Sequence, residues 1–274
     1  MATRSLTAPE GVPGSAERPL LADRRIVVTG VLTNRSLAYH AAERMQQLGA
    51  EIVLTSFKRQ RRITERAAQT LPDPPDVLEL DVLEPSDFSA LTDELRSRWG
   101  CVDGVLHSIA FAPPELFNEP FMEVPYESVD VAMRASTYSM HALVAALLPL
   151  MRESPGGASV VGLTAAQRAR MHSYAWMAVV KSALAGLVRQ LAVQCGRDGT
   201  RVNLLAAGPL RTNAGSAIPG LDDLAEDFRE RAPLGWDDRN FSAIAEPTCF
   251  LLSEYSRLIT GEVLNVDGGR HVVL

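Results

Sequence analysis

Short apolar runs alternate with longer segments of helical period along most of the chain. We expect strands at residues 25–29, 51–56, 77–80, 102–108, 158–163, 201–206 and 262–266. We expect helices at residues 36–48, 58–70, 86–99, 126–151, 174–196, 221–231 and 241–253. Strands that are apolar throughout are typical of a parallel sheet with helices on both faces. The sequence therefore predicts an α/β fold with a doubly wound, seven-stranded parallel sheet of Rossmann type.

The composition limits the classes of protein that this chain can belong to. With 46% hydrophobic residues in a chain of 274, it can bury one substantial core, and we expect one domain over residues 23–274. Residues 1–22 are rich in Ala, Pro, Gly and Ser and lack the apolar stretch of a secretory signal, so we expect a disordered tail. A net charge of −6 argues against a nucleic-acid surface.

Other features favour a soluble protein of the cytoplasm. The longest apolar stretch, residues 142–151, is too short to cross a bilayer and contains Pro149, so we expect no membrane association. Cys101, Cys195 and Cys249 lack metal-like spacing and are interpreted as free thiols of a reducing compartment. The histidines are scattered, and we predict no metal site.

The first expected strand leads into a turn that could bind a dinucleotide. Gly30 lets the backbone turn tightly and approach a pyrophosphate, and Ser36 stands at a plausible helix N-cap where an anion is favoured. The usual three-glycine fingerprint is absent, because Leu32 and Arg35 replace two of its glycines. An ordinary loop between a strand and a helix remains the alternative.

The second expected strand ends without a carboxylate, which bears on the choice of coenzyme. An acid at this place would bind a ribose 2′-hydroxyl, whereas Phe57 is followed here by Lys58 and Arg59. Two cations suit a 2′-phosphate, so NADPH is favoured over NADH. The alternative is that both cations only open a solvated helix. Asp81, which closes the third strand, could accept a bond from adenine or cap the next helix.

Tyr174 and Lys181 are the candidate catalytic pair. Seven residues separate them, so both fall within about 20° of one another around a helix, two turns apart. The long Lys side chain leans toward the helix N-terminus and thus toward the Tyr. We expect the nearby cation to lower the pKa of the phenol and favour proton donation. Without the turn at Gly30, the pair would be interpreted as an ordinary amphipathic face.

Taken together, these residues resemble the divergent short-chain dehydrogenase/reductases, and specifically the enoyl-acyl carrier protein reductases. The resemblance covers about nine tenths of the chain in one collinear order. The matching segments are 30–38, 80–82, 103–109, 174–184, 201–212 and 260–269. Two departures from ordinary ketoreductases agree with it. The position four residues after the Tyr, where they carry Lys, is Ala178, and the position of their catalytic Ser is Val161.

The resemblance implies reduction of a 2-enoyl thioester with hydride from NADPH or NADH. Lys181 would bind the nicotinamide ribose, and Tyr174 would stabilise the enolate. The residues implied in coenzyme binding are Gly30, Val31, Ser36, Leu37, Phe57, Lys58, Arg59, Asp81, Val82, Ser108, Ile109, Ala110, Leu163, Lys181, Gly208, Pro209, Leu210 and Thr212. Those implied in substrate binding are Ala165, Met171, Tyr174, Met177, Ala214 and Ile218. Residues 213–231 would form a lid, and the family implies a homotetramer.

One departure from the family concerns the substrate. The family carries a second aromatic nine or ten residues before the catalytic Tyr, where this chain has Ala165 and Thr164. A missing ring enlarges the site and suggests a substrate that is bulky near the carbonyl, or a lost activity. An acyl carrier protein or coenzyme A could carry the acyl group, in fatty-acid or secondary metabolism. The alternatives are a tailoring reductase for another activated alkene or imine, and a nucleotide-binding relic without catalysis.

Overall fold

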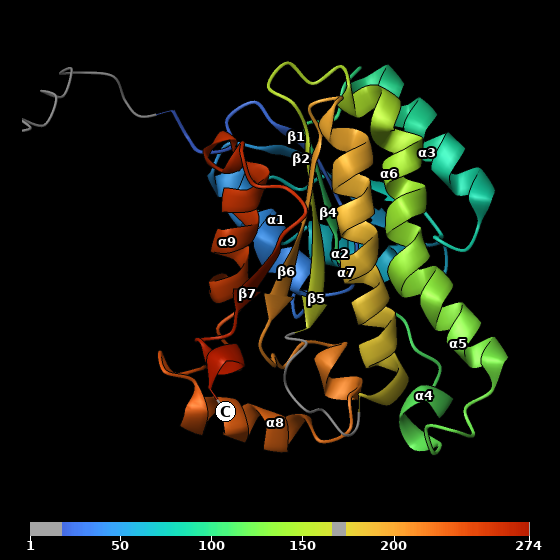
Figure 1. Cartoon of the computed structure of the whole chain (residues 1–274). Helices are drawn as coiled ribbons and strands as arrows, with labels where there is room; N and C mark the ends of the chain where they lie inside the picture. The colour runs from blue at the N-terminus through green and yellow to red at the C-terminus, as the bar shows by residue number, and fades with distance from the viewer. Residues whose placement is uncertain (1–17, 166–173, 274) are drawn as a thin grey trace, which may run out of the picture.

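The computed structural model describes residues 18–165 and 174–273, and its centre is one parallel sheet (Figure 1). Its seven strands follow the order β3-β2-β1-β4-β5-β6-β7, and all six pairings are parallel. The strands are β1 (Arg25–Val28), β2 (Glu51–Ser56), β3 (Val77–Glu79), β4 (Gly104–His107), β5 (Ser159–Ala165), β6 (Arg201–Ala207) and β7 (Val263–Val266). The predicted doubly wound α/β fold is confirmed. The strand order reverses between β1 and β4, which is where open α/β sheets bind ligands.

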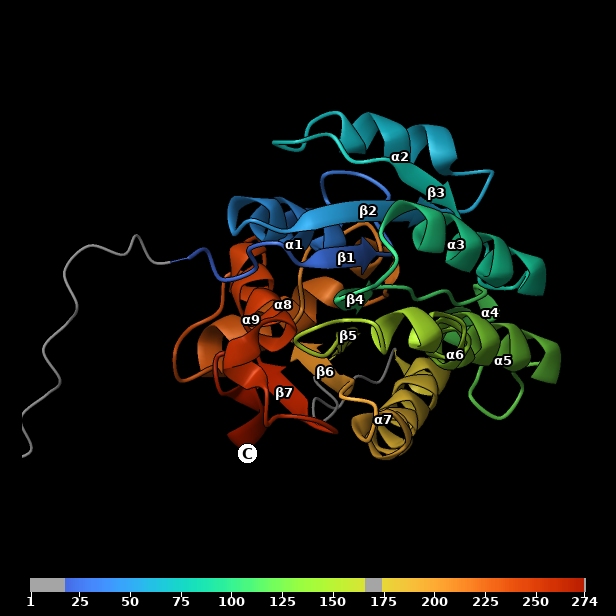
Figure 2. The same cartoon turned by 90° about the horizontal axis from the view of Figure 1, so that it is seen from above.

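Helices cover both faces of this sheet (Figures 1 and 2). The first face carries α1 (Leu37–Gln47), α2 (Arg61–Ala68) and α9 (Ser242–Leu252). The second face carries α3 (Pro85–Arg98), α6 (Ser139–Met151) and α7 (Ala175–Gly196). The remaining α-helices, α4 (Glu115–Asn118), α5 (Tyr126–Met133) and α8 (Leu221–Arg231), lie beyond the carboxyl ends of the strands in Figure 1.

The alternation of side chains along each strand creates the two cores. In β1, Ile26 and Val28 point into the core on the α1 and α9 side, while Val27 points into the core on the α3, α6 and α7 side. All three side chains have no exposed surface. A strand that is buried on both faces must be apolar at every position, which is why the short apolar runs located the strands so closely.

One predicted helix, residues 126–151, is interrupted. It consists of α5, a single π-helical turn that we call η1 (Arg134–Tyr138), and α6. The interruption coincides with buried hydroxyl groups that bind neighbouring elements, among them Ser136 and Thr137. A π turn is a short bulge inside a longer helix, and the prediction of one continuous helix did not separate it.

Helix α7 is, by length and apolar composition, the one described helix that could cross a membrane. Its residues Leu184, Val188 and Leu191 pack against the sheet in the same core as α6. Figures 1 and 2 both show α7 lying along the sheet next to α6. We conclude that α7 is a core helix.

Candidate active site

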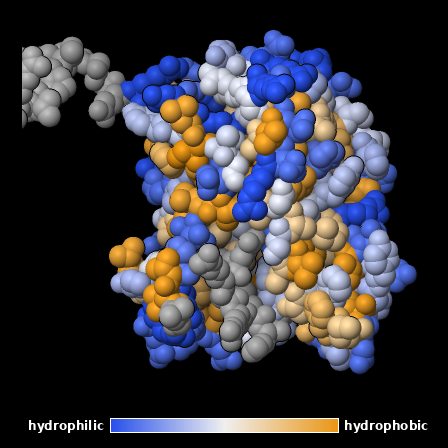
Figure 3. Space-filling model, viewed as in Figure 1, coloured by the Kyte–Doolittle hydropathy of each residue, from blue (hydrophilic) through white to orange (hydrophobic). Residues whose placement is uncertain are grey.

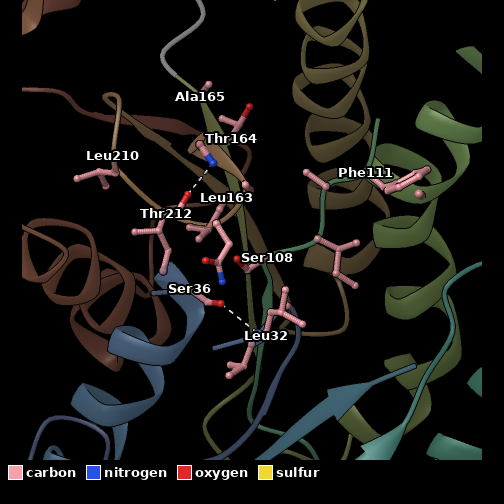
Figure 4. A pocket seen from close by; sticks show the side chains of 18 of the residues that line it. Leu32, Ser36, Ser108, Phe111, Leu163, Thr164, Ala165, Leu210 and Thr212 are labelled. Carbon is pink, nitrogen blue, oxygen red and sulfur yellow. Dashed lines mark hydrogen bonds between the residues drawn. The ribbon is translucent and has the colours of Figure 1, made fainter. Parts of the chain in front are cut away.

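A cavity of about 760 Å³ opens at the carboxyl ends of the strands. Its walls come from the loops that follow β1, β2, β3, β4 and β6, together with the end of β5 and the start of α7. Figure 4 shows Leu210 and Thr212 on one side of it and Phe111 on the other, with Leu163 and Thr164 from β5 between them. The sheet thus gathers at one edge residues that are far apart in the sequence.

The turn after β1 is shaped by close packing against β4. Gly30 has φ of 83°, and a Cβ there would lie 1.9 Å from the carbonyl oxygen of Ser108. Ser36 occupies the N-cap of α1, but its hydroxyl bonds backward, accepting from the amides of Leu32 at 3.0 Å and Thr33 at 3.2 Å. Because those two bonds occupy its lone pairs, its proton remains available to an acceptor in the cavity.

The turn after β2 places only one of its two cations in the cavity wall. Phe57, Arg59 and Gln60 line the cavity, whereas Lys58 is exposed and lies outside its wall. Neither Lys58 nor Arg59 forms an ion pair within the described residues. Asp81 lines the cavity beside them and accepts a bond from the Leu83 amide at 2.9 Å. That bond stabilises the turn between β3 and α3.

Tyr174 and Lys181 both line the cavity and both are almost fully buried. Tyr174 is the N-cap residue of α7, so the helix starts one residue later than expected. Lys181 donates from Nζ to the carbonyl oxygen of Leu163, at 3.2 Å. Both side chains therefore reach the cavity from α7, and Lys181 is bound there to the end of β5.

Burial dominates the acid–base properties of this pair. It raises the pKa of the Tyr174 phenol to about 12 and lowers the pKa of the Lys181 ammonium to about 8. The expectation that the pKa of the phenol is lowered was wrong, because burial removes the hydration of the phenolate and raises this pKa. At neutral pH Tyr174 is thus a neutral hydrogen-bond donor and Lys181 a cation.

The loop after β6 is held from several sides. A Cβ at Gly208 would lie 2.7 Å from the Trp236 ring, and Trp236 donates from Nε1 to the Pro209 carbonyl at 2.7 Å. Thr212 Oγ1 accepts from the Gly215 amide at 2.8 Å, which leaves its proton for another acceptor. These contacts give the loop from Gly208 to Thr212 a fixed shape beside the cavity.

The predicted substrate residues divide into three groups. Ala165, Ala214 and Ile218 line the cavity with Tyr174. Met177 lies behind it, 3% exposed, in a small apolar cluster with Val180. Met171 lies outside the described residues, as do Gln167, Arg168 and Arg170.

The predicted coenzyme residues, apart from Lys58, all contribute to the cavity wall. They are Gly30, Val31, Ser36, Leu37, Phe57, Arg59, Asp81, Val82, Ser108, Ile109, Ala110, Leu163, Lys181, Gly208, Pro209, Leu210 and Thr212. Sequence reasoning missed wall residues such as Phe111, Ala135 and Phe228. Phe111 directly follows the predicted run at 108–110 and could have been included. Ala135 belongs to η1, which has no signal in the sequence.

Apolar side chains also gather on the outer surface next to this cavity. The rings of Phe121 and Trp176 stack with centroids 4.9 Å apart, and Met122 is 89% exposed. Figure 3 shows the apolar surface over α4 and the start of α7. Within the described residues, no group of three His, Cys, Asp or Glu side chains could hold a metal ion.

A family profile described as Enoyl-(Acyl carrier protein) reductase matches residues 30–271. The chain belongs to this family. The predicted resemblance to the enoyl reductases is thereby confirmed, and the protein is an oxidoreductase of the class that acts on carbon–carbon double bonds. The match starts at the Gly30 turn and runs through β7, so it spans every wall of the cavity.

Individual enoyl reductases resemble the chain over nearly its whole length. It is 42% identical over 264 residues to the NADH enoyl-[acyl-carrier-protein] reductase of Mycolicibacterium smegmatis, covering 91% of this chain and 97% of that protein. The NADH enzyme of Mycobacterium avium is 38% identical, with the same coverage. An enzyme of Staphylococcus aureus whose name specifies NADPH is 33% identical, covering 92% and 98%. The names of the two mycobacterial relatives do not support the expected preference for NADPH.

Proposed function

We propose that the protein reduces the double bond of a 2-enoyl thioester, with hydride from a reduced nicotinamide dinucleotide. One observation carries this proposal: in a member of the enoyl reductase family, Tyr174 and Lys181 line the same cavity as the Gly30 turn. The carboxyl edge of a parallel sheet at its switch point is where such coenzymes bind.

The residues present fit a dinucleotide. Ser36 and Thr212 both line the cavity, and each has a hydroxyl proton left over after accepting backbone bonds. Together with the N-terminus of α1, they would bind the pyrophosphate. Asp81 lies where the adenine amino group is expected, and Lys181 would bind the ribose hydroxyls next to the nicotinamide. The bound coenzyme supplies the hydride.

Tyr174 would act on the thioester carbonyl. Addition of hydride at the β-carbon sends negative charge to the thioester oxygen, and a neutral phenol can donate a hydrogen bond to that oxygen. The raised pKa of Tyr174, caused by burial, keeps the proton on the phenol throughout the working pH range. The ammonium of Lys181 would stabilise the same developing charge and orient the ribose. Protonation at the α-carbon completes the reduction.

We propose NADPH as the preferred coenzyme, with NADH as the competing possibility. The proposal rests on Arg59 in the cavity wall, Lys58 beside it, and a β2 end that has no carboxylate. A guanidinium binds a phosphate bidentately. Comparing kcat/KM for both coenzymes in the wild type and in a Lys58→Ala, Arg59→Ala double variant tests it. A loss confined to NADPH supports phosphate recognition, whereas equal losses for both coenzymes contradict it.

The substrate end suits an acyl thioester carried by an acyl carrier protein or by coenzyme A. The apolar side chains of Ala165, Ala214 and Ile218 line the cavity and could contact an acyl chain. Residues 213–231, including α8, would be the lid of the domain formed by residues 23–274. Arg211 connects this segment to the loop after β6 through Asp222, at 2.7 Å.

We also propose a homotetramer in the cytoplasm. Helix α7 leaves Val179 and Val193 exposed, 43% and 69%, on the side away from the sheet core, and a neighbouring subunit could cover them. All three cysteines are free and buried, which suits a reducing compartment. Light scattering of the purified protein tests the subunit number.

Ala165 supports a second candidate, a reductase of the same fold for a bulkier activated alkene or imine. Its methyl group leaves open the space that an aromatic ring fills in relatives with that pattern. Coenzyme oxidation with a panel of straight-chain and 2-methyl-branched enoyl thioesters distinguishes the candidates. Turnover of straight-chain thioesters supports the main proposal. Turnover of branched substrates only supports the second, and coenzyme binding without any turnover supports a non-catalytic role.

A further inference from the structure

The π-helical turn η1 stands between two walls of the cavity. Three buried hydroxyl side chains, Ser136, Thr137 and Ser139, project from it or directly follow it. Their exposed fractions are 0%, 5% and 0%. Each hydroxyl binds a different part of the molecule, and Ala135, which directly precedes Ser136, lines the cavity. Buried hydroxyl groups cost free energy unless they are paired, so these pairings hold the surrounding elements in place.

Ser136 holds the loop after β4. Its Oγ accepts a hydrogen bond from the Phe111 amide at 2.9 Å and donates one to the Phe111 carbonyl at 3.0 Å. Both backbone polar groups of Phe111 are therefore bound by one side chain. The Phe111 ring, 52% exposed, forms the wall of the cavity opposite Leu210 and Thr212 in Figure 4. Ser136 thereby fixes the position of Phe111 in the cavity wall.

Thr137 holds α7 at the level of the catalytic pair. Its Oγ1 donates to the Val180 carbonyl at 2.8 Å, and Val180 immediately precedes Lys181. A carbonyl oxygen has two lone pairs, so this bond adds to the helical hydrogen bond instead of replacing it. This bond joins α7 to η1 one residue before Lys181, which lines the cavity.

Ser139 joins η1 to the end of β4. Its hydroxyl donates to the Ala135 carbonyl at 2.6 Å, so its only proton is used. The 2.8 Å contact with His107 must then be a bond from the imidazole Nε2–H to Ser139 Oγ. Burial, together with the charge of Lys181, lowers the pKa of His107 to about 3, so the ring is neutral and adds no charge near Lys181.

We propose that η1 is a positioning element that sets the separation between the Phe111 wall and the Tyr174–Lys181 pair. Ser136 is a positioning residue for Phe111, and Thr137 is one for Lys181. This inference rests on the proposed function of the cavity. Successive residues of a helical turn point in different directions, which lets Ser136 reach the β4 loop while Thr137 reaches α7. π turns are frequent at functional sites.

The first test is Thr137→Val, which removes the hydroxyl and keeps the shape. We expect the dissociation constant of the reduced coenzyme, measured by calorimetry, to rise about tenfold, because small displacements at a site are costly. Thr137→Ser keeps the hydroxyl and should restore binding. The matched control is Thr248→Val in α9, whose buried hydroxyl donates to the Ile244 carbonyl at 2.7 Å, away from the cavity. It should lower Tm without changing coenzyme affinity.

The second test is Ser136→Ala, which releases both bonds to Phe111. We expect KM for an enoyl thioester to rise about tenfold with coenzyme affinity within about twofold of wild type. The two variants thus affect different ligands. Coenzyme affinity and KM that stay at wild-type values in both variants, with only Tm lowered as in Thr248→Val, overturn the proposal. The proposal is also overturned if both variants lose coenzyme affinity and raise KM to the same extent and Thr137→Ser does not restore coenzyme affinity.

The tests separate this proposal from the proposed function. Coenzyme binding is measured without any enoyl substrate, so the Thr137 result stands even if the wild type reduces no thioester. Absence of turnover in a wild type that binds coenzyme contradicts the enoyl reductase proposal. A rise in the coenzyme dissociation constant in Thr137→Val would still support the positioning of Lys181 by η1.

Discussion

The two ends of the cavity are built in different ways. At the coenzyme end, short loops at strand ends carry the wall, and each is fixed by local bonds such as those to the Ser36 and Thr212 hydroxyls. At the substrate end, Phe111, Ala135, Ala165 and Tyr174 come from four separate elements and meet only through tertiary packing.

This difference predicts where the molecule tolerates change. The loops of the coenzyme end are fixed both by these local bonds and by close contacts with neighbouring segments, such as Gly30 with Ser108 and Pro209 with Trp236. The substrate end depends on the relative position of β5, α7 and η1, and a small side chain such as Ala165 alters its volume directly. We therefore expect variants at the coenzyme end to change affinity for one ligand, and variants at the substrate end to change turnover or the choice of substrate.

Tyr174→Phe gives the largest expected effect. It removes the hydrogen-bond donor to the developing enolate, and we expect kcat to fall by about a hundredfold to a thousandfold, with coenzyme affinity unchanged. Steady-state kinetics and calorimetry measure the two quantities. Tyr39→Phe is the matched control, because the buried Tyr39 hydroxyl is bonded at Thr70 and lies outside the cavity. If Tyr174→Phe also lowers coenzyme affinity, Tyr174 does not act at the substrate end alone, and the predicted difference between the two ends is wrong.

Lys181→Ala comes second and should act on the coenzyme. Removal of the ammonium takes away the expected bonds to the ribose, and we expect the coenzyme dissociation constant to rise about tenfold to a hundredfold. Calorimetric titration measures it. If Lys181→Ala and Tyr174→Phe lower turnover and coenzyme affinity to the same extent, the separate roles assigned to the two residues are wrong.

The pH profile gives the next largest effect. Burial lowers the pKa of Lys181 to about 8, so rising pH removes its proton through that value. The cation is present below pH 8, and we expect kcat/KM to fall about tenfold per pH unit above it. Tyr174, with a pKa raised to about 12, stays protonated in this range. Lys181→Arg should move the decrease in kcat/KM to higher pH. If the pH profile of that variant is unchanged, a group other than Lys181 causes the decrease.

Ala165→Phe has the smallest expected effect and tests the substrate end alone. The ring should fill the open space, lowering kcat/KM for 2-methyl-branched enoyl thioesters about tenfold, while straight-chain thioesters keep or gain activity. Coenzyme affinity should not change. Equal losses for both classes of thioester indicate that the space at Ala165 does not select the substrate.

The strands could be predicted because their evidence is local. The expected strand at residues 51–56 coincides with β2, and the other six differ by one or two residues at their ends. The turn at Gly30 and the pair Tyr174 and Lys181 were found from spacing and from the family resemblance. The break at η1 was missed, since a π turn occurs as a single turn inside a longer helix and its hydrogen bonds depend on the folded backbone.

Three details of the site depended on surroundings that no spacing reveals. Met177 was expected at the substrate, but it is 3% exposed, lies outside the cavity wall and packs with Tyr174 and Val180 in an apolar cluster. Lys58 was expected beside the coenzyme, but it lies outside the cavity wall. The pKa of Tyr174 moves up instead of down, because Tyr174 is 8% exposed and its burial disfavours the charged phenolate.

The sequence by itself determined the sheet and the strand-end loops, and it singled out Tyr174 and Lys181 as the proposed catalytic pair, because period, glycine geometry and residue type act over a few neighbours. Only the tertiary structure decided the protonation of Tyr174 and Lys181, and the bonds that Ser136 and Thr137 make across η1. Those properties depend on which groups from distant segments exclude water and supply hydrogen-bond partners, and folding alone brings such groups together.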